Sequence, residues 1–451
     1  MSLLLTGGAV VTSLDPVAVE VADVLIGGGH IVAAGAPSQE EHAERAIKEC
    51  IDASGCLVIP GNVNAHMHLY SALARGMPYA VEPPLNFLQI LQRVWWRLDR
   101  ALDEESIRAS ALVGGMEALL SGTTTLIDHH ASPDAIDGSL DVVAEALGSL
   151  GLRSVCAYEV SDRDGPERAG AGLDESARFL GAVADGAFPL ARGMVGAHAS
   201  FTLSSETLEA CVALADEHEV GIHIHAAEDV VDEIDSQRRY GLRVAERLAD
   251  AGALTDATLL AHGVQLDDEE VRLVKASGAT LAHNPRSNMN NSVGRTPLSR
   301  LGDRVALGTD GIGSDMFAES QAAFFRLRDD GAAPAPDWPL ARLTRGAEFA
   351  GRAFAEPALG RIETGAPADL VILDYGAPTP VDASTLAGHW LYGLASRHVR
   401  DVIVAGQVVV RERRLALVDQ EALVAEARDQ ASRLWQRLDS IDSHPFDPQE
   451  V

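Results

Sequence analysis

Four patches of histidine and acidic residues, each at the end of a short apolar stretch, constrain the fold of this chain more than any other feature. The patches are residues 64–68, 223–228, 261–263 and 308–311. Short runs rich in Val, Ile and Leu are typical of strands buried in a parallel sheet. In a closed barrel of alternating strands and helices, residues at the carboxyl ends of several strands meet at one face. The sequence therefore predicts one site assembled from four distant segments.

The side chains in these patches are of the types that bind a divalent cation. His66 and His68 alternate along one expected strand, so both rings should point to the same side of it. His225 can supply a third nitrogen and Asp310 an oxygen, which leaves a position open for water, as in a catalytic site. One divalent metal ion is expected, with Zn²⁺ preferred, although Fe²⁺ suits the same ligands. A His-x-His pair alone is weak evidence, so the prediction depends on all four patches together.

The middle of the chain, residues 61–358, alternates apolar stretches with segments of helical periodicity, which predicts a (β/α)₈ barrel. A doubly wound open sheet is the alternative, but ligands that converge from many strands suit a closed ring better. Helices are expected over 105–120 and 208–218. Strands are expected over 124–128, 153–157, 193–198, 221–225, 258–262, 280–283 and 305–310.

The two ends of the chain share a different pattern, in which short strands are separated by glycine turns. A hairpin is expected over residues 23–35, with the glycine triplet 27–29 as its turn. A further strand is expected over 368–374, a second hairpin over 402–410 and a closing helix over 421–439. We therefore expect residues 1–60 and 359–451 to form one small β-sandwich domain with a C-terminal helix, beside a barrel domain of residues 61–358.

Composition narrows the class of partner and the compartment. The formal net charge of −30 argues against a nucleic-acid partner, because phosphate binding needs a basic surface. The first residues contain neither a basic segment nor a long apolar run, so no signal peptide and no transmembrane span are expected. The four cysteines are scattered and favour reduced thiols in a cytoplasmic protein. They form no C-x-x-C pair, which excludes the zinc deaminases whose signature contains one.

Four longer segments carry a resemblance to a known family. They are residues 95–106, 128–133, 283–291 and 308–317, which read WWRLDRALDEES, DHHASP, HNPRSNMNN and GTDGIGSDMF. Over essentially its whole length the chain resembles the amidohydrolase superfamily, in the branch of the cytosine, guanine and methylthioadenosine deaminases and the triazine hydrolases. Within that branch it is most similar to the SsnA-type aminohydrolases. The resemblance implies a barrel, a metal-dependent deamination and a homodimer or higher homo-oligomer.

The lysine content supports a single metal ion. Many binuclear relatives bridge two ions with a carboxylated lysine on a barrel strand, but this chain has only two lysines. Lys48 precedes the barrel, and Lys275 lies in a stretch whose apolar spacing predicts a helix. A lysine-bridged pair of ions is therefore not expected.

The resemblance also implies roles for the residues around the metal. Glu228 would shuttle a proton to the ring nitrogen, and Asp310 would bind the metal and take a proton from the water. His262 would polarise the attacking hydroxide or the developing oxyanion. The alternatives are a solvated Glu228 at a helix start and His262 as a fifth ligand. His223 is expected to face away from the pocket and to pack in the core.

Substrate contacts are expected from segments at the same face of the barrel. Gln89, Trp95 and Trp96 belong to the long segment after the first strand and could line a lid over an aromatic ring. The alternatives are a satisfied core histidine for His129 or His130, a structural ion pair for Arg286, and core packing or a dimer contact for Trp95 and Trp96. The candidate contacts are Gln89, His130, His198 and Arg286.

Three classes of function fit these residues. The first is a metal-dependent hydrolase that deaminates a small-molecule N-heterocycle, such as a purine- or pterin-like base, and releases ammonia. The second is hydrolysis of another ring leaving group, as in a chlorohydrolase, or of a cyclic amide. The third is a binder of metal or ligand without catalysis. The presence of both Glu228 and Asp310 favours deamination.

Overall fold

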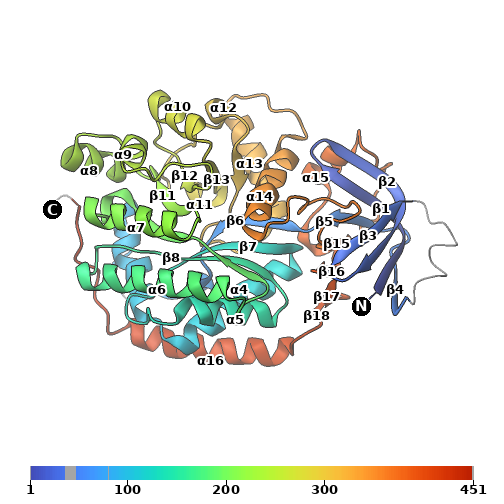
Figure 1. Ribbon diagram of the computed structural model, residues 1–451, viewed down its shortest axis with the longest axis horizontal. Coiled ribbons are helices and arrows are strands. Elements are labelled where there is room, and N and C mark those ends of the chain that lie inside the picture. Colours follow the sequence, from blue (N-terminus) through green and yellow to red (C-terminus); the bar gives the residue numbers. More distant parts are fainter. Residues whose placement is uncertain (1, 36–46, 80, 449–451) are drawn as a thin grey trace.

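The computed structural model of the protein describes residues 2–35, 47–79 and 81–448. It contains a parallel α/β barrel and a separate mixed sheet at one side of the barrel (Figure 1). The predicted (β/α)₈ barrel with a terminal β-sandwich sheet is therefore confirmed. In the described residues, no helix has the length and apolar character needed to cross a membrane.

The barrel is built from two runs of parallel strands that join into a ring. Two isolated parallel bridges, Val160 with Ala197 and Met67 with Asp310, connect the runs at both seams. This closure rules out the open sheet. The first run is β6 (Asn62–Met67), β7 (Thr123–His130), β8 (Arg153–Tyr158) and β9 (Ala191–Gly193). The second is β10 (Val195–Ala199), β11 (Ile222–Ala226), β12 (Leu259–His262), β13 (Thr280–His283) and β14 (Val305–Leu307).

Helices cover the outside of the ring (Figure 1). Capping residues set the first residue of two of the predicted helices. The helix predicted from residue 105 begins at Glu104, because Asp103 and Ser106 form a reciprocal capping box before it. The helix predicted around Lys275 begins after a second capping box at Asp267 and Glu270. The helices between and after the barrel strands include α4 (Glu104–Leu120), α5 (Ser139–Ser149), α6 (Pro166–Ala184), α7 (Ser205–Glu217), α8 (Val230–Tyr240), α9 (Val244–Asp250), α10 (Asp268–Ser277), α11 (Pro285–Asn290), α12 (Leu298–Leu301), α13 (Met316–Asp329) and α14 (Trp338–Phe354).

Apolar side chains form a small core within the barrel region. Ala65, Val155, Met194 and Ala306 belong to this cluster and are buried. Every residue of β6, β7, β8 and β10–β14 is likewise buried, as expected for strands covered on both faces. The polar side chains of the barrel lie outside this apolar cluster, together with the residues that follow the strands.

The terminal sheet joins both ends of the chain. In the described residues its order is β18-β17-β16-β15-β5-β1-β2-β3, with β4 paired to β1. The predicted hairpin at 23–35 is present, and Gly28 and Gly29 turn it with φ of 63° and 89°. The strands are β1 (Ser2–Leu14), β2 (Val17–Gly27), β3 (His30–Gly35), β4 (Glu49–Asp52), β5 (Leu57–Pro60), β15 (Leu370–Leu373), β16 (Val399–Val404), β17 (Gln407–Arg411) and β18 (Arg414–Leu415).

The closing helix α16 (Gln420–Leu438) runs along the outside of the barrel, at the lower edge of Figure 1. Its main contacts are with α4 and with α3 (Trp96–Ala101). Leu423, Ala427 and Leu434 are buried, as the sequence pattern predicts. Trp435 donates a hydrogen bond of 3.0 Å to the Leu73 carbonyl oxygen. The helix therefore ties the chain end to the segment that follows the first barrel strand.

Candidate metal centre and pocket

Four predicted ligands lie together at the carboxyl ends of the barrel strands. His66 lies on β6 and His68 directly follows it, His225 lies on β11, and Asp310 follows β14. Their potential ligand atoms all lie within 4.8 Å of one another. Asp310 Oδ1 is 3.1 Å from His68 Nε2 and 3.6 Å from His66 Nε2, and His68 Nε2 is 3.1 Å from His225 Nε2.

The second nitrogen of each ring has a partner that fixes the ring orientation. His68 Nδ1 donates to the carbonyl oxygen of His129 at 2.7 Å, and His225 Nδ1 donates to that of His198 at 2.8 Å. His66 Nδ1 lies 2.8 Å from His223 Nε2. Partners of this kind orient metal-binding imidazoles. In each ring they leave Nε2 directed at the centre of the group.

His223 is buried and lies outside the pocket wall, as expected, but it does not face away from His225. Residues 223 and 225 are two apart on β11, and the period of a strand places both on the same face. His223 therefore lies beneath His66 inside the barrel and stacks on His129, with ring centroids 4.4 Å apart. His129 faces these rings, whereas its neighbour His130 faces Tyr70 and Tyr158.

The four residues fit a divalent ion chemically. Three imidazole nitrogens and one carboxylate oxygen are a ligand set that Zn²⁺ accepts while keeping a place for water. His66 Nε2 is buried and has no hydrogen-bond partner among the described residues, so it needs one from outside the protein. Burial lowers the pKa of His66 to about 3, which keeps its ring neutral, as a metal ligand must be.

Glu228 and His262 lie beside this group. Glu228 Oε2 is 3.5 Å from His262 Nε2, and the two group with Asp310. Burial and the charge of Asp310 raise the pKa of Glu228 well above its ordinary value, which favours the protonated form of its carboxyl. His262 Nδ1 lies 2.8 Å from Asn288 Oδ1, which orients the ring. This arrangement places a proton donor and an oriented imidazole next to Asp310.

Three residues of this site adopt a left-handed backbone that non-glycine residues rarely take. The φ angles are 51° for Ala227, 75° for His262 and 55° for Asp310. Such conformations persist where the surrounding structure enforces them, and they concentrate at functional sites. Here each one follows or ends a barrel strand. The backbone of Asp310 is held in place by its N–H, which donates to the carbonyl oxygen of His66 at 3.0 Å.

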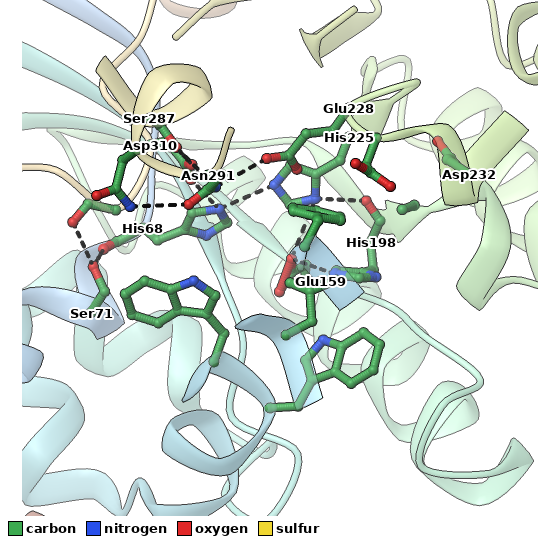
Figure 2. A pocket seen from close by; sticks show the side chains of 18 of the residues that line it. His68, Ser71, Glu159, His198, His225, Glu228, Asp232, Ser287, Asn291 and Asp310 are labelled. Carbon is green, nitrogen blue, oxygen red and sulfur yellow. Dashed lines mark hydrogen bonds and ion pairs between the residues drawn. The ribbon is translucent and has the colours of Figure 1, made fainter. Parts of the chain in front are cut away.

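A pocket opens directly over the four ligands and encloses about 1000 Å³, including its open mouth. Figure 2 shows His68, His225, Glu228 and Asp310 around it, with Glu159 and His198 on the side of His225 away from Glu228. Trp95 and Trp96, expected as a cover for an aromatic ring, both line the wall. An apolar wall with a few convergent polar groups is typical of a small-molecule site.

Among the predicted substrate contacts, the structure brings only His198 to the pocket wall. Gln89 instead accepts a hydrogen bond from the backbone N–H of Leu85 at 2.9 Å, within its own short segment. His130 is buried and lies 3.0 Å from the Ser132 hydroxyl. Arg286 pairs with Glu319 and donates to the Gly313 carbonyl oxygen at 2.9 Å. His130 therefore fits the alternative of a core histidine, and Arg286 fits the alternative of a structural ion pair.

Several polar residues of the pocket were not identified from the sequence, and two of them lie beside the candidate ligands. Glu159 and Arg163 lie in the segment after β8 and both line the pocket. The signal that could have found Glu159 is its position: it directly follows an apolar barrel strand, as the metal-binding patches do. Arg163 lies in a loop, where sequence pattern alone does not fix the direction of a side chain.

Comparisons with known proteins agree with this geometry. Residues 57–409 match the amidohydrolase family. A 5-methylthioadenosine/S-adenosylhomocysteine deaminase of Haloarcula marismortui is 34% identical over 453 residues, which cover 96% of this chain and 99% of that protein. The crystal structure of an adenosine deaminase from Xanthomonas campestris with bound zinc has a TM-score of 0.84 and 26% identity, covering 96% and 98% of the two chains. That of the atrazine chlorohydrolase TrzN from Arthrobacter aurescens TC1, complexed with zinc, has a TM-score of 0.79 and 25% identity, covering 95% and 100%.

Proposed function

Because the chain belongs to the amidohydrolase family, we propose that it is a metal-dependent aminohydrolase that deaminates an adenine-type N-heterocycle and releases ammonia. The observation that carries this proposal is the position of the Glu228 carboxyl, which groups with Asp310 and His262 beside the candidate ligands, with Oε2 3.5 Å from His262 Nε2. Loss of ammonia from a ring carbon needs a proton on the ring nitrogen and another on the leaving amine. Glu228 is the acid in position to supply the first proton, and the proton that Asp310 takes from the attacking water accounts for the second.

One divalent ion would be held by His66, His68, His225 and Asp310, with Zn²⁺ preferred and Fe²⁺ suited to the same set. When bound, such an ion lowers the pKa of a coordinated water toward neutrality. These ligand assignments are proposals, supported by the distances within the group and by the unpartnered Nε2 of His66.

The side chains around the ion have separate tasks. Ser287 donates a hydrogen bond to Asp310 Oδ2, which leaves Oδ1 facing the histidines and able to accept a proton from the attacking water. His262 has its Nδ1 turned to Asn288, so its buried Nε2 can hold that water in line with the ring carbon. Glu228 is steadied by Asn291, whose Nδ2 donates to Glu228 Oε1 at 3.3 Å. These groups orient the reactants and move protons.

Hydrolysis of another ring leaving group is the second candidate, because the similar structures include a chlorohydrolase. Chloride leaves as an anion and needs no proton. An amino group, in contrast, must gain a proton before it can leave as ammonia. A carboxyl in the position of Glu228, which can deliver a proton beside the candidate ligands, therefore favours deamination over dechlorination. Opening of a cyclic amide on the same scaffold remains the other form of this alternative.

The test is ammonia release by zinc-loaded protein from a panel of aminopurines, aminopyrimidines and aminopterins, with Asp310→Ala as the blank. Release from at least one adenine-type compound, absent in the variant, supports the proposal. Release of no ammonia by protein shown to bind zinc contradicts it. Chloride release or ring opening from the corresponding compounds would then identify the second candidate.

We also propose a cytoplasmic homo-oligomer of the SsnA type, with residues 1–60 and 359–451 as one domain and 61–358 as the other. The four family-like segments support the narrower kinship. The cysteines of the described chain are all free, in keeping with a reducing compartment. Size-exclusion chromatography with light scattering tests the oligomeric state.

A further inference from the structure

Glu159 is a buried carboxyl without a hydrogen-bonding partner. Its side chain is 2% exposed and lines the pocket beside the candidate metal ligands. Oε1 lies 3.6 Å from His225 Nδ1 and 3.7 Å from both His198 Nε2 and His129 Nδ1. These separations exceed hydrogen-bond lengths. In the described part of the chain no group donates a hydrogen bond to the Glu159 carboxyl, which faces the pocket, where a bound ligand can supply the donor.

A second metal ion does not account for Glu159. Glu159, His68, His129 and His225 gather within 4.8 Å, but the rings of His68 and His225 have no nitrogen to spare. The Nδ1 atom of each donates to a backbone carbonyl oxygen, and each Nε2 faces the first metal position. Glu159 and His129 alone would remain, and two ligands are fewer than a protein metal site needs.

An ion pair with Arg163 does not account for Glu159 either. The Arg163 guanidinium pairs with Asp99 and with Asp164, whose Oδ2 lies 3.1 Å from Nε. It also lies over the Trp96 ring, 5.3 Å from the centroid. Arg163 is therefore held against the wall, and Glu159 remains the free acceptor in this part of the pocket.

We propose that Glu159 is a specificity-determining residue, which accepts a hydrogen bond from an N–H group of the heterocycle other than the amino group that leaves. The inference rests on the proposed deamination and narrows its substrate class to aminoheterocycles with a second N–H donor, such as diaminopurines and aminopterins. The position of Glu159 points to the ring rather than to a distant substituent. Its carboxyl borders the His225 imidazole, whose other nitrogen faces the metal position.

Adenosine and 2,6-diaminopurine riboside test this inference, because they differ only by the 2-amino group. Neither has a ring N–H, so the 2-amino group of the second compound is the added donor. We expect zinc-loaded wild-type protein to prefer the diaminopurine riboside by about 10- to 100-fold in kcat/KM, the range for a hydrogen bond to a charged group. In Glu159→Ala this preference should fall to about one. Glu159→Asp, which keeps the carboxyl but shortens its reach, should give an intermediate ratio and serves if the alanine variant does not fold.

The matched control is Asp229→Asn, which removes one negative charge from the rim of the same pocket. Asparagine can still cap α8, and the substrate ratio should stay at the wild-type value. An equal ratio in wild-type protein and both Glu159 variants, or a wild-type ratio near one, overturns the inference.

Equilibrium binding separates this inference from the proposed function. Quenching of the fluorescence of the pocket tryptophans is followed for both ribosides with each zinc-loaded protein. Preferential binding of the diaminopurine riboside that depends on Glu159, without ammonia release, supports the role of Glu159 and contradicts deamination. Ammonia release from both ribosides at similar efficiency supports deamination and contradicts the role of Glu159. Binding of neither compound overturns the inference.

Discussion

His66 and His223 touch ring to ring, with His66 Nδ1 2.8 Å from His223 Nε2, although 157 residues separate them. His66 belongs to β6 and His223 to β11, so the contact crosses the barrel interior. His223 has no place in the four-ligand group. It acts on the metal position by fixing the orientation of a ligand ring.

Replacement of His223 should therefore weaken metal binding without removing a ligand. We expect His223→Ala to lower the affinity for Zn²⁺ about 10- to 100-fold, as for other residues that orient a metal-binding histidine. His223→Gln, which can still form a hydrogen bond to His66, should lower the Zn²⁺ affinity by a smaller factor. Competition with a chromophoric chelator measures the affinity. The control is His130→Gln, a buried histidine on β7 that faces away from the group, and equal losses in the two proteins would contradict this role.

Replacement of Glu228 should separate catalysis from metal binding. Glu228→Gln keeps the size of the side chain but cannot deliver a proton, so kcat should fall about 10²- to 10⁴-fold. The zinc content, measured by atomic absorption, should remain that of the wild type because Glu228 is outside the four-ligand group. Asn291→Ala removes the hydrogen bond to Glu228 and should have a smaller effect on kcat. Loss of zinc from Glu228→Gln would instead make Glu228 a ligand.

The barrel and the metal group could be predicted because each depends on local rules. Strand alternation places His66 and His68 on one side, and parallel strands bring their carboxyl ends to one face. The same alternation applied to residues 223 and 225 gives a shared face as well, which is what the structure has. The expectation that His223 faces away from His225 did not apply this alternation to β11. The interior of the barrel holds both at different depths.

The substrate pocket could be predicted much less well, because its wall depends on loops and on distant packing. Gln89 was assigned from its neighbourhood to Trp95, yet its amide turns back to Leu85. Glu159 was overlooked because one glutamate after a strand resembles a solvated strand end. Only the packing of His129, His198 and His225 from three other strands shows that it is buried beside the metal position.

The carboxyl of Asp232 should make stability depend on pH. It accepts hydrogen bonds from the backbone N–H of Ala227 at 2.8 Å and of Phe201 at 3.0 Å. Burial nevertheless raises its pKa from 3.8 to about 7, so the folded protein holds this proton more tightly than the unfolded chain. The resulting stability is complete below about pH 4 and is lost as the pH rises toward 7.

Asp232→Asn removes that titration, since the amide resembles the protonated acid. Urea unfolding of both proteins at pH 4.5 and pH 7 measures the effect. Between pH 4.5 and pH 7, the free energy of unfolding should fall by roughly 2–4 kcal/mol more in the wild-type protein than in the variant. Other titrating groups are shared by the two proteins and cancel in this difference. An identical pH dependence in both would show that Asp232 is ionised in the folded protein throughout the range.

Arg286 should support the fold rather than bind substrate. Its guanidinium pairs with Glu319, which is fully buried and whose pKa burial raises to about 7 against the opposing charge of Arg286. Arg286→Met leaves that carboxylate without its partner and should lower the free energy of unfolding by about 3–5 kcal/mol. Arg286→Met with Glu319→Leu should recover part of this loss, because an apolar pair replaces the buried charges.

KM in the folded Arg286→Met protein should stay within about threefold of the wild type, since Arg286 lies outside the pocket wall. A large rise in KM with unchanged stability would instead make Arg286 a substrate contact.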